Sequence, residues 1–361
     1  AMLTQYLCAQ GYSVGTYTSP HFLHFNERIA LNDSPCDDDM LCRAFDAIET
    51  AREGVALTYF EFSTLAALWI FDQSKLDYWV LEVGLGGRLD SVNMVDTDVA
   101  VVTSIALDHM DWLGDNLDVI AREKTGIARK DKLLISGVVN PPSTIASTAQ
   151  EIGAILRQKG EDFHFSRNGG VWSWLGEDVQ YDNLPVPALP LQNAATVVAV
   201  LVYMGFTPTQ ADLSTLFANA QLTGRFQQVA SSPDVYIDVA HNPEAAVELS
   251  LRLSELPTKP IAVCGMLKDK DIDAVMDHLS GSFSRWFCCD LPGPRGAKAS
   301  ELIKSISQQS HKSSLEEYSF QSVREAFAAA LAQARVEHCP VIVFGSFVTV
   351  SEYLALSQLK E

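Results

Sequence analysis

The amino-acid sequence predicts an α/β fold with a mainly parallel sheet in a first domain and a smaller Rossmann-like second domain. In the first half, the apolar run at residues 78–81 and the β-branched run at 99–105 have the length of strands, and each is followed by polar side chains and glycine. In the second half, short apolar runs alternate with amphipathic helical stretches. Parallel sheets place ligands at the carboxyl ends of their strands, so we expect the site there.

The first of these strand ends carries a carboxylate and then a glycine-rich turn, LEVGLGGRLD at residues 81–90. Glycines allow positive φ angles and let the backbone approach an anion. The G-x-G-G spacing differs from the G-x-G-x-x-G of a dinucleotide site, and Glu82 precedes the glycines, so a nicotinamide site is disfavoured. Taken alone, such a segment is more often an ordinary tight turn than a site.

The second strand end contains Asp108, His109 and Asp111. A single histidine is usually structural, but two ionisable clusters at adjacent strand ends favour a functional site. Residues 120–127 are then predicted to form a helix in which Lys124 lies among apolar neighbours. Lys124 either belongs to a solvated helix face, paired with Glu123, or points at the same site.

Composition indicates a soluble enzyme that does not bind nucleic acid or an anionic membrane. The formal net charge of −19 is opposite in sign to the basic surface that such partners require. The seven cysteines show no C-x-x-C spacing, which favours a reducing cytoplasm over a disulfide framework. The sequence has no signal peptide and no apolar span of membrane length. We therefore expect a cytoplasmic protein, and a monomer.

The sequence resembles the folylpolyglutamate synthase/dihydrofolate synthase family of the Mur ligase superfamily, from end to end. The segments that carry the resemblance, in the family's order, are TSPHF (18–22), NERI (26–29), TYFE (58–61), LEVGLGGRLDSVN (81–93), SIALDHMDWLG (104–114), REKTGI (122–127), QNAAT (192–196), GRFQ (224–227), DVAHNPEA (238–245), GMLKDKD (265–271) and GSF (345–347). The pairing of the first two segments with the glycine-rich turn resembles the folate branch and not the cell-wall peptide branch.

The resemblance implies a Mur-ligase-like architecture of two domains. Residues 1–224 are expected to form the ATPase and folate-binding domain, closed by helices at 192–203 and 208–219, and residues 225–361 the Rossmann-like glutamate-ligase domain. Strands of the second domain are predicted at 235–239, 261–264, 286–289 and 341–344. The segment 163–190, with Trp172 and Trp174, is predicted to form strands and loops packed on the first domain.

One part of the family pattern does not occur in the sequence. The family's phosphate-binding loop, between its first strand and first helix, is expected just before Ala1, and no G-K-[ST] occurs in the 361 residues. Residues 1–10 resemble the remainder of the helix that this loop starts. We therefore expect an N-terminally truncated chain that lacks the first strand and the P-loop.

The implied reaction is ATP-dependent amide formation between L-glutamate and dihydropteroate or a (poly)glutamyl tetrahydrofolate, through an acyl phosphate. Ser19 and Glu82 match the family's ligands for one Mg²⁺, and His109 matches a ligand of a second. Lys124 matches a lysine that is carboxylated by CO₂, which turns a cation that repels Mg²⁺ into an anion that attracts it. Lys124, His241 and Glu82 are the expected catalytic residues.

The resemblance assigns further contacts position by position. Thr58, Tyr59, Phe60 and Glu61, with Leu89, Asp90 and Ser91, match the segments that bind dihydropteroate. Asn193, Arg225 and Asp238 match contacts to ATP, and His241 and Ser346 match residues near the incoming glutamate. The structural alternative is helix capping or core packing for the first group and satisfied polar groups at strand ends for the others.

Two other functions stay open at this point. Without the P-loop, the chain is compatible with a catalytically silent relative that binds folate or a protein partner. A cell-wall peptide ligase is the other alternative, and nucleotide-sugar substrates would reveal it. The metal-ligand candidates Glu82 and His109, with Lys124, favour catalytic ancestry, because a pure binding module does not need them.

Overall fold

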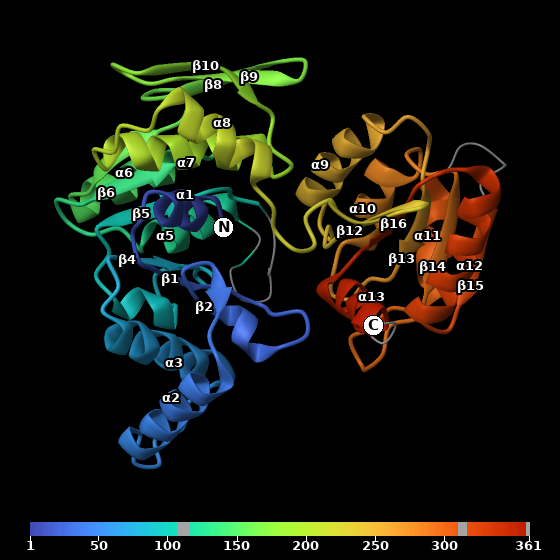
Figure 1. Cartoon of the computed structure of the whole chain (residues 1–361), viewed down its shortest axis with the longest axis horizontal. Coiled ribbons are helices and arrows are strands. Elements are labelled where there is room, and N and C mark those ends of the chain that lie inside the picture. The colour runs from blue at the N-terminus through green and yellow to red at the C-terminus, as the bar shows by residue number, and fades with distance from the viewer. Residues whose placement is uncertain (107–113, 115, 310–315, 359–361) are drawn as a thin grey trace. The chain divides into compact units, whose positions relative to one another are not determined.

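The computed structural model describes all residues except 107–113, 115, 310–315 and 359–361. Its internal contacts divide the chain into unit 1, Ala1–Ala220, and unit 2, Gln221–Glu361 (Figure 1). The division falls a few residues before the boundary at 224 and 225 predicted from the sequence. No helix among the described residues has both the length and the apolar character needed to cross a membrane.

The sheet that carries the first strand end is mixed rather than mainly parallel. Its strands, in spatial order, are β3 (Ser34–Pro35), β2 (Ile29–Leu31), β1 (Val14–Tyr17) and β4 (Tyr78–Leu81). Only β1 and β4 run parallel, with Tyr17 opposite Leu81, so both strands end at the same level. Among the described residues β4 forms an edge, and its Trp79 is 38% exposed, so the strand is less buried than its apolar sequence suggests.

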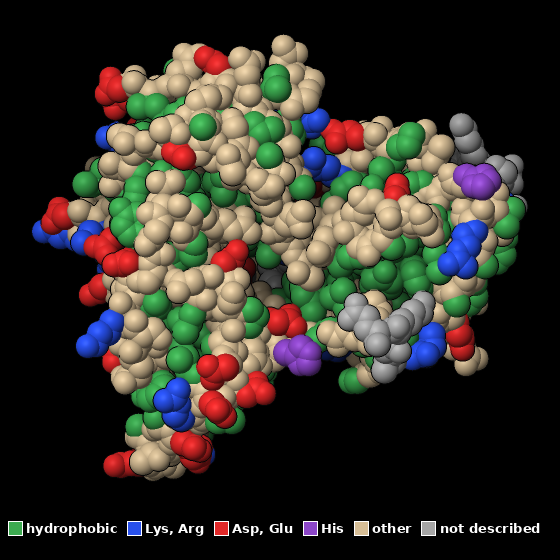
Figure 2. Space-filling view, viewed as in Figure 1, with side chains coloured by type: hydrophobic (Ala, Val, Ile, Leu, Met, Phe, Trp, Pro, Cys, Tyr) green, Lys and Arg blue, Asp and Glu red, His purple; other side chains and the backbone are tan. Residues whose placement is uncertain are grey.

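Three helices accompany this sheet: α1 (Met2–Ala9), α2 (Asp38–Ala51) and α3 (Tyr59–Ser74). Asp37 caps the start of α2: its carboxylate accepts a hydrogen bond of 2.6 Å from the Met40 nitrogen. Its outer face is acidic, and Figure 2 shows acidic side chains gathered at the end of unit 1 that holds α2. This surface agrees with the negative net charge and would repel a nucleic-acid backbone.

The second sheet of unit 1 is parallel, as predicted. It consists of β5 (Val99–Val102), β6 (Leu133–Ser136) and β7 (Ile155–Gln158), with helices α5 (Leu117–Thr125) and α6 (Ser143–Ile152). The predicted strand at 99–105 ends earlier, at Val102, because its partner β6 ends opposite it at Ser136. The helix α5 contains Lys124, which confirms the helix predicted at 120–127.

An antiparallel meander forms the predicted aromatic segment of unit 1. Its strands are β8 (His164–Asn168), β9 (Val171–Leu175) and β10 (Gln180–Pro185), and they lie beside α7 (Leu191–Tyr203) and α8 (Gln210–Asn219) (Figure 1). Trp172 and Trp174 are buried in the core shared with these helices. The indole nitrogen of Trp174 donates a hydrogen bond of 3.0 Å to the carbonyl oxygen of Ala195 in α7.

Unit 2 is the predicted Rossmann-like domain. Its six-stranded sheet has the order β11 (Gln227–Ser231), β12 (Asp234–Asp238), β16 (Val341–Phe344), β13 (Ile261–Cys264), β14 (Arg285–Cys289) and β15 (Glu316–Phe320). All pairs are parallel except β11 with β12. The helices are α9 (Pro243–Ser254), α10 (Ile272–Leu279), α11 (Ala299–Gln309), α12 (Val323–Glu337) and α13 (Phe347–Gln358). The central strands β13 and β16 are fully buried, which explains their uninterrupted apolar sequences.

Candidate functional site

The ends of β1 and β4 bring Ser19 and Glu82 together. The backbone nitrogen of Ser19 donates a hydrogen bond of 2.9 Å to the Glu82 carboxylate, and the Glu82 nitrogen donates one of 2.9 Å to the Tyr17 oxygen. The structure thus places a carboxylate and a serine at the carboxyl ends of two parallel strands; the sequence pattern predicts this position for Glu82, and the family resemblance adds Ser19.

The glycine-rich turn after Glu82 is held from within by Asp90. The carboxylate of Asp90 accepts hydrogen bonds from the backbone nitrogens of Gly84 (3.1 Å), Leu85 (3.0 Å) and Val92 (2.9 Å). A side chain at Gly84 would collide with the ring of Phe60, so this position requires glycine. Asp90 and Phe60, both expected to bind substrate, therefore also shape the turn.

The turn packs closely against the end of α5, next to Lys124. A Cβ atom on Gly87 would lie 2.6 Å from the Glu123 carbonyl oxygen and 3.0 Å from the Lys124 Cα atom. One on Gly126 would lie 2.6 Å from the Arg88 Cβ atom. The Glu123 carboxylate accepts hydrogen bonds from the Arg88 guanidinium at 2.9 and 3.0 Å. Arg88, whose role the sequence left open, thus forms an ion pair with Glu123, and Lys124 is half-buried beside the turn.

A pocket of about 450 Å³ opens beside the turn, which we call the Arg88 pocket. It is lined by Leu57, Glu61, Thr64, Leu65, Arg88, Leu89, Asp90, Ser91, Asn93 and Met94. Four of the residues expected to bind substrate line it: Glu61, Leu89, Asp90 and Ser91. The Ser91 and Thr64 hydroxyls are 2.8 Å apart, which connects the short helix η2 (Ser91–Met94) to α3.

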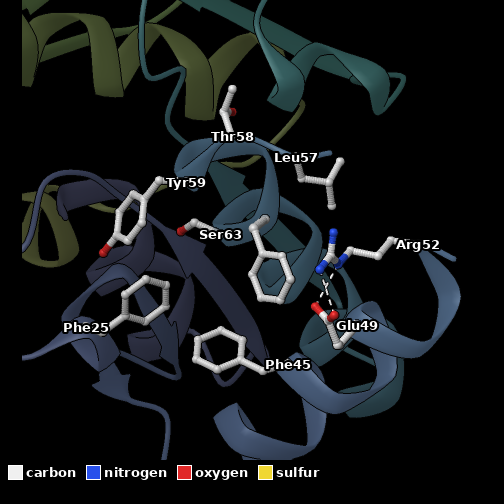
Figure 3. A pocket seen from close by; sticks show the side chains of 9 residues that line it. Phe25, Phe45, Glu49, Arg52, Leu57, Thr58, Tyr59 and Ser63 are labelled. Atoms are coloured by element: carbon white, nitrogen blue, oxygen red, sulfur yellow. Dashed lines mark hydrogen bonds and ion pairs between the residues drawn. The ribbon is translucent and has the colours of Figure 1, made fainter. Parts of the chain in front are cut away.

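A second pocket, of about 440 Å³, lies between α2 and the start of α3, and we call it the aromatic pocket (Figure 3). Its lining is Phe25, Phe45, Glu49, Arg52, Leu57, Thr58, Tyr59, Phe62 and Ser63. Figure 3 shows the rings of Phe25, Phe45 and Tyr59 close together, with the Glu49–Arg52 ion pair at another side. The expected residues Thr58 and Tyr59 therefore face a different pocket from Glu61, although Leu57 lines both.

Thr58 and Glu61 also have a structural role at the start of α3. The Thr58 nitrogen donates to the Glu61 carboxylate at 2.7 Å, and the Glu61 nitrogen donates to the Thr58 hydroxyl at 3.2 Å. This reciprocal pair is a capping box, the structural alternative that the spacing T-x-x-E also predicts. Sequence reasoning did not assign a role to Phe25, Phe45 or Phe62, because aromatic residues at helical spacing are usually core.

In unit 2, Asp238 lies at the end of β12 with its carboxylate almost fully buried. It accepts hydrogen bonds from the backbone nitrogens of Phe226 (2.8 Å) and Ala240 (2.7 Å). Burial raises the pKa of Asp238 to about 6, although these two hydrogen bonds and the nearby Arg225 favour the ionised form. Asp238 thus connects the segment just before β11, next to Arg225, with the segment that follows β12.

Arg225, His241 and Ser346 gather at the carboxyl ends of β12 and β16. The Arg225 guanidinium lies 5.6 Å from the centre of the Phe347 ring, and the His241 ring lies 6.5 Å from the same ring. The Nδ1 atom of His241 is 2.7 Å from the Val239 carbonyl oxygen, so Nδ1 carries the proton in the neutral ring. The buried Ser346 hydroxyl accepts from the Thr349 nitrogen at 3.0 Å. Phe347 joins these residues and was not assigned a role from the sequence.

Of the two remaining site residues, Asn193 and His109, the structure describes only Asn193. Asn193 is in the first turn of α7, and its backbone nitrogen donates to the Pro190 oxygen at 3.0 Å. The start of α7 approaches the end of β6 closely, because a Cβ atom on Gly137 would collide with Thr196. His109 lies outside the described residues. Within the described ranges, no group of three His, Cys, Asp or Glu side chains could hold a metal ion alone.

Comparison with known proteins gives matches over almost the whole chain. A family model for the Mur ligase, glutamate ligase domain, matches residues 224–347. The chain is 44% identical over 354 residues to the dihydrofolate synthase/folylpolyglutamate synthase of Escherichia coli (strain K12), which covers 98% of this chain and 82% of that protein. The match runs through both units.

Solved structures agree with this result. The structure of E. coli FolC in complex with DHPP and ADP has 43% identity and a TM-score of 0.92, covering 99% of this chain and 85% of that one. A bifunctional folylpolyglutamate synthase/dihydrofolate synthase with Mn, AMPPNP and L-glutamate bound has 41% identity and a TM-score of 0.90, covering 99% of this chain and 86% of that one. The α/β architecture of both units is therefore that of these ligases.

Proposed function

Because the chain belongs to the dihydrofolate synthase/folylpolyglutamate synthase family, we propose that it joins L-glutamate to dihydropteroate and to the γ-carboxylate of (poly)glutamyl tetrahydrofolate, using ATP. The observation that carries this proposal is the 44% identity to a bifunctional ligase along 98% of the chain. The related structures that hold ADP, AMPPNP, Mn and L-glutamate support ATP, a divalent metal and glutamate as ligands. The protein is a carboxylate–amine ligase of folate biosynthesis.

The chemistry explains why such a site needs charge neutralisation. A carboxylate is a poor acyl donor in water, so the γ-phosphoryl group of ATP is first transferred to it, and the amine of glutamate attacks the acyl phosphate. Phosphoryl transfer depends mainly on positioning and on neutralising phosphate charge. The hydrogen bond from the Ser19 nitrogen holds that residue next to the Glu82 carboxylate, and a serine hydroxyl with a carboxylate is a set of hard oxygen donors that suits Mg²⁺, with water and phosphate oxygens as its other ligands. Bound Mg²⁺ would neutralise phosphate charge there.

A second metal and a modified lysine complete the proposed site. His109 is assigned to the second Mg²⁺, as an expectation from the family alone. Lys124 is assigned as a carboxylated lysine, whose negative charge would attract Mg²⁺ where an ammonium would repel it. The close approach of the Lys124 backbone to Gly87 supports this assignment, because it places α5 against the turn that follows Glu82.

The folate substrate is assigned to the Arg88 pocket and the neighbouring start of α3. Glu61, Leu89, Asp90 and Ser91 line that pocket, and Thr58 and Tyr59 line the adjoining aromatic pocket. Phe60 packs beneath the glycine-rich turn and supports it. A planar ring system fits an aromatic lining, and the Arg88 guanidinium, although paired with Glu123, is half-exposed in the pocket and carries the right charge for an acidic substrate.

In unit 2 the proposed roles follow from the strand-end cluster. Arg225 and Asp238, with Asn193 of unit 1, are assigned to ATP, and His241 and Ser346 to the side that meets glutamate. The positive charge of Arg225 suits a phosphate group. The buried Asp238 carboxylate accepts hydrogen bonds from two backbone nitrogens, so its role is to hold the chain next to Arg225 in place. We place the protein in the cytoplasm as a monomer.

The test is ADP release by the protein as expressed from its gene, with Mg²⁺, L-glutamate and dihydropteroate or tetrahydrofolate, each omitted in turn. We expect release to require all four components and the product to gain the mass of one glutamyl residue. Release that ignores the folate, or that responds to nucleotide-sugar peptides, would instead indicate a cell-wall ligase. Binding of the folate without any turnover would indicate the catalytically silent relative.

A further inference from the structure

The loop that follows β1, residues 18–24, is held in place by the segment 26–29, to which no role has been assigned so far. We call residues 18–24 the Ser19 loop. The Glu27 carboxylate accepts hydrogen bonds from three consecutive backbone nitrogens of this loop: Phe22 (2.7 Å), Leu23 (2.8 Å) and His24 (2.7 Å). Glu27 therefore fixes the second half of the loop and the start of the short helix η1 (Phe25–Arg28).

Arg28 is attached to the Ser19 loop on both sides of Ser19. The carbonyl oxygen of Arg28 accepts a hydrogen bond of 2.9 Å from the Thr18 nitrogen. Its Nε atom donates one of 2.7 Å to Nδ1 of His21. Ser19 thus lies between two attachments to one residue, and its own nitrogen is bonded to Glu82. These three bonds leave the backbone of Ser19 little freedom to move away from Glu82.

The environment of Arg28 shows that its charge is not used in an ordinary ion pair. The residue is only 7% exposed, and among the described residues its guanidinium has no carboxylate partner. It lies against two neighbouring aromatic rings, 5.7 Å from the centre of Phe25 and 5.3 Å from that of Tyr59. Burying a guanidinium is costly, and an apolar residue would serve packing alone as well or better. The directional bond from Nε to His21 is what an apolar residue cannot provide.

We propose that Arg28 and His21 are positioning residues, which hold the hydroxyl of Ser19 in place beside Glu82 for a divalent metal bound with nucleotide. The proposal rests on the proposed function, in which Ser19 and Glu82 are metal ligands. Side chains that orient metal ligands without touching the metal typically contribute 10- to 100-fold to metal affinity, a change that a binding titration can resolve. Arg28 also contacts Tyr59, a lining residue of the aromatic pocket, so the same side chain borders both proposed sites.

The test is Mn²⁺ binding in the presence of AMPPNP, followed by the electron paramagnetic resonance signal of free Mn²⁺, with the protein as expressed from its gene. Arg28→Met keeps an unbranched side chain against the two rings but loses the donor, and we expect the Kd for Mn²⁺ to rise about 10-fold or more. His21→Leu removes the acceptor and should give a similar rise. His21→Asn presents an amide oxygen near the position of Nδ1, so it should retain most of the affinity.

The matched control is Arg157→Met. Arg157 also combines a ring contact, 5.1 Å from Tyr203, with a hydrogen bond of 2.9 Å to Asp162, but it belongs to β7, away from the Ser19 loop. Its Kd for Mn²⁺ should equal that of the parent. Melting temperatures of all variants are measured together, and His21→Leu replaces Arg28→Met if the latter does not fold.

Ser19→Ala separates this proposal from the one on which it rests. If Ser19→Ala weakens Mn²⁺ binding but folded Arg28→Met and His21→Leu bind as the parent does, the positioning role is overturned and the metal assignment stands. If Ser19→Ala itself binds Mn²⁺ with parent affinity, Ser19 is not a metal ligand, and both proposals fall. Equal weakening by His21→Leu and His21→Asn would also contradict the positioning role, because the acceptor would then not matter.

Discussion

The Asp238 carboxylate holds the backbone nitrogen of Phe226 at 2.8 Å, across the gap between the start of β11 and the end of β12. Phe226 has a φ of +43°, in the left-handed region that residues with a side chain rarely adopt. Its ring is stacked on Tyr236 at 4.9 Å. The hydrogen bond and the stacking together stabilise an unfavourable backbone angle at Phe226. They thereby fix the position of the neighbouring Arg225 backbone, from which the guanidinium extends.

The first prediction concerns Asp238 and pH. Its pKa is raised from 3.8 to about 6 in the folded protein, so its contribution to stability is fully present below pH 3.8 and is lost as pH rises through about 6. Between pH 5.5 and 7.5 we expect the parent to lose about 1 kcal/mol of unfolding free energy relative to Asp238→Asn, which does not titrate. Urea unfolding of both proteins at the two pH values measures the difference. A difference that is constant with pH would contradict the raised pKa.

A second prediction tests Glu82 as a metal ligand. Glu82→Gln keeps the shape of the side chain but removes the charge that balances Mg²⁺, so kcat should fall at least ~100-fold, the scale of a single electrostatic contributor. Glu177→Gln, an exposed carboxylate between β9 and β10, is the control and should retain parent kcat. Steady-state ADP release at saturating Mg²⁺ measures both. Near-parent turnover of Glu82→Gln would refute the assignment, and His109→Ala is expected to behave as Glu82→Gln does.

The third prediction tests the proposed carboxylation of Lys124. Lys124→Ala should abolish ligase activity without unfolding the protein, because the anion that attracts Mg²⁺ is lost. Added acetate should restore part of the activity by entering the vacated space, whereas acetamide, of equal size but neutral, should not. Lys130→Ala, at an exposed lysine shortly after α5, is the control and should not respond to either. High activity of Lys124→Ala without added acid would show that Lys124 is an ordinary surface lysine.

A fourth prediction concerns the contact between the glycine-rich turn and α5. Gly87→Ala places a methyl group 2.6 Å from the Glu123 carbonyl oxygen, which the backbone on both sides must move to accept. We expect a loss of about 1–3 kcal/mol in unfolding free energy, as for other overpacked positions. Gly170→Ala, where a Cβ atom meets nothing within 4 Å, should be neutral or slightly stabilising. Thermal unfolding compares the two, and equal melting temperatures would show that the contact can relax.

Buried strands of the parallel sheets were the most predictable part of the fold. Residues 261–264 and 341–344 form strands with the predicted bounds, because both faces of these strands are covered and only apolar residues fit. The strand expected at 99–105 ends at Val102 instead. The residues after Val102 are Thr103 and Ser104, and hydrogen bonding stops where β6 stops; the length of a partner strand is not visible in the sequence of β5 itself.

The candidate site was predictable where strand ends decide the geometry. The sequence pattern alone places Glu82 at a strand end, whereas its pairing with Ser19 comes from the family resemblance, because the short strand β1 before Ser19 is not evident in the sequence. The division of the substrate residues between two pockets could not be predicted, since it depends on how α2 packs on α3. Thr58 and Glu61 illustrate the remaining ambiguity: one spacing satisfies both a capping box and a binding motif, and only coordinates show that the cap is formed.

The meander β8–β10 contains none of the proposed site residues, yet it sets the register of a helix that does. Trp174 is completely buried and bonded to the Ala195 carbonyl, two positions along α7 from Asn193. The buried indole therefore restricts translation and rotation of α7 along its axis. If Asn193 contacts ATP as proposed, the β8–β10 meander contributes to nucleotide binding from outside the site, because its buried indole fixes the helix that carries Asn193.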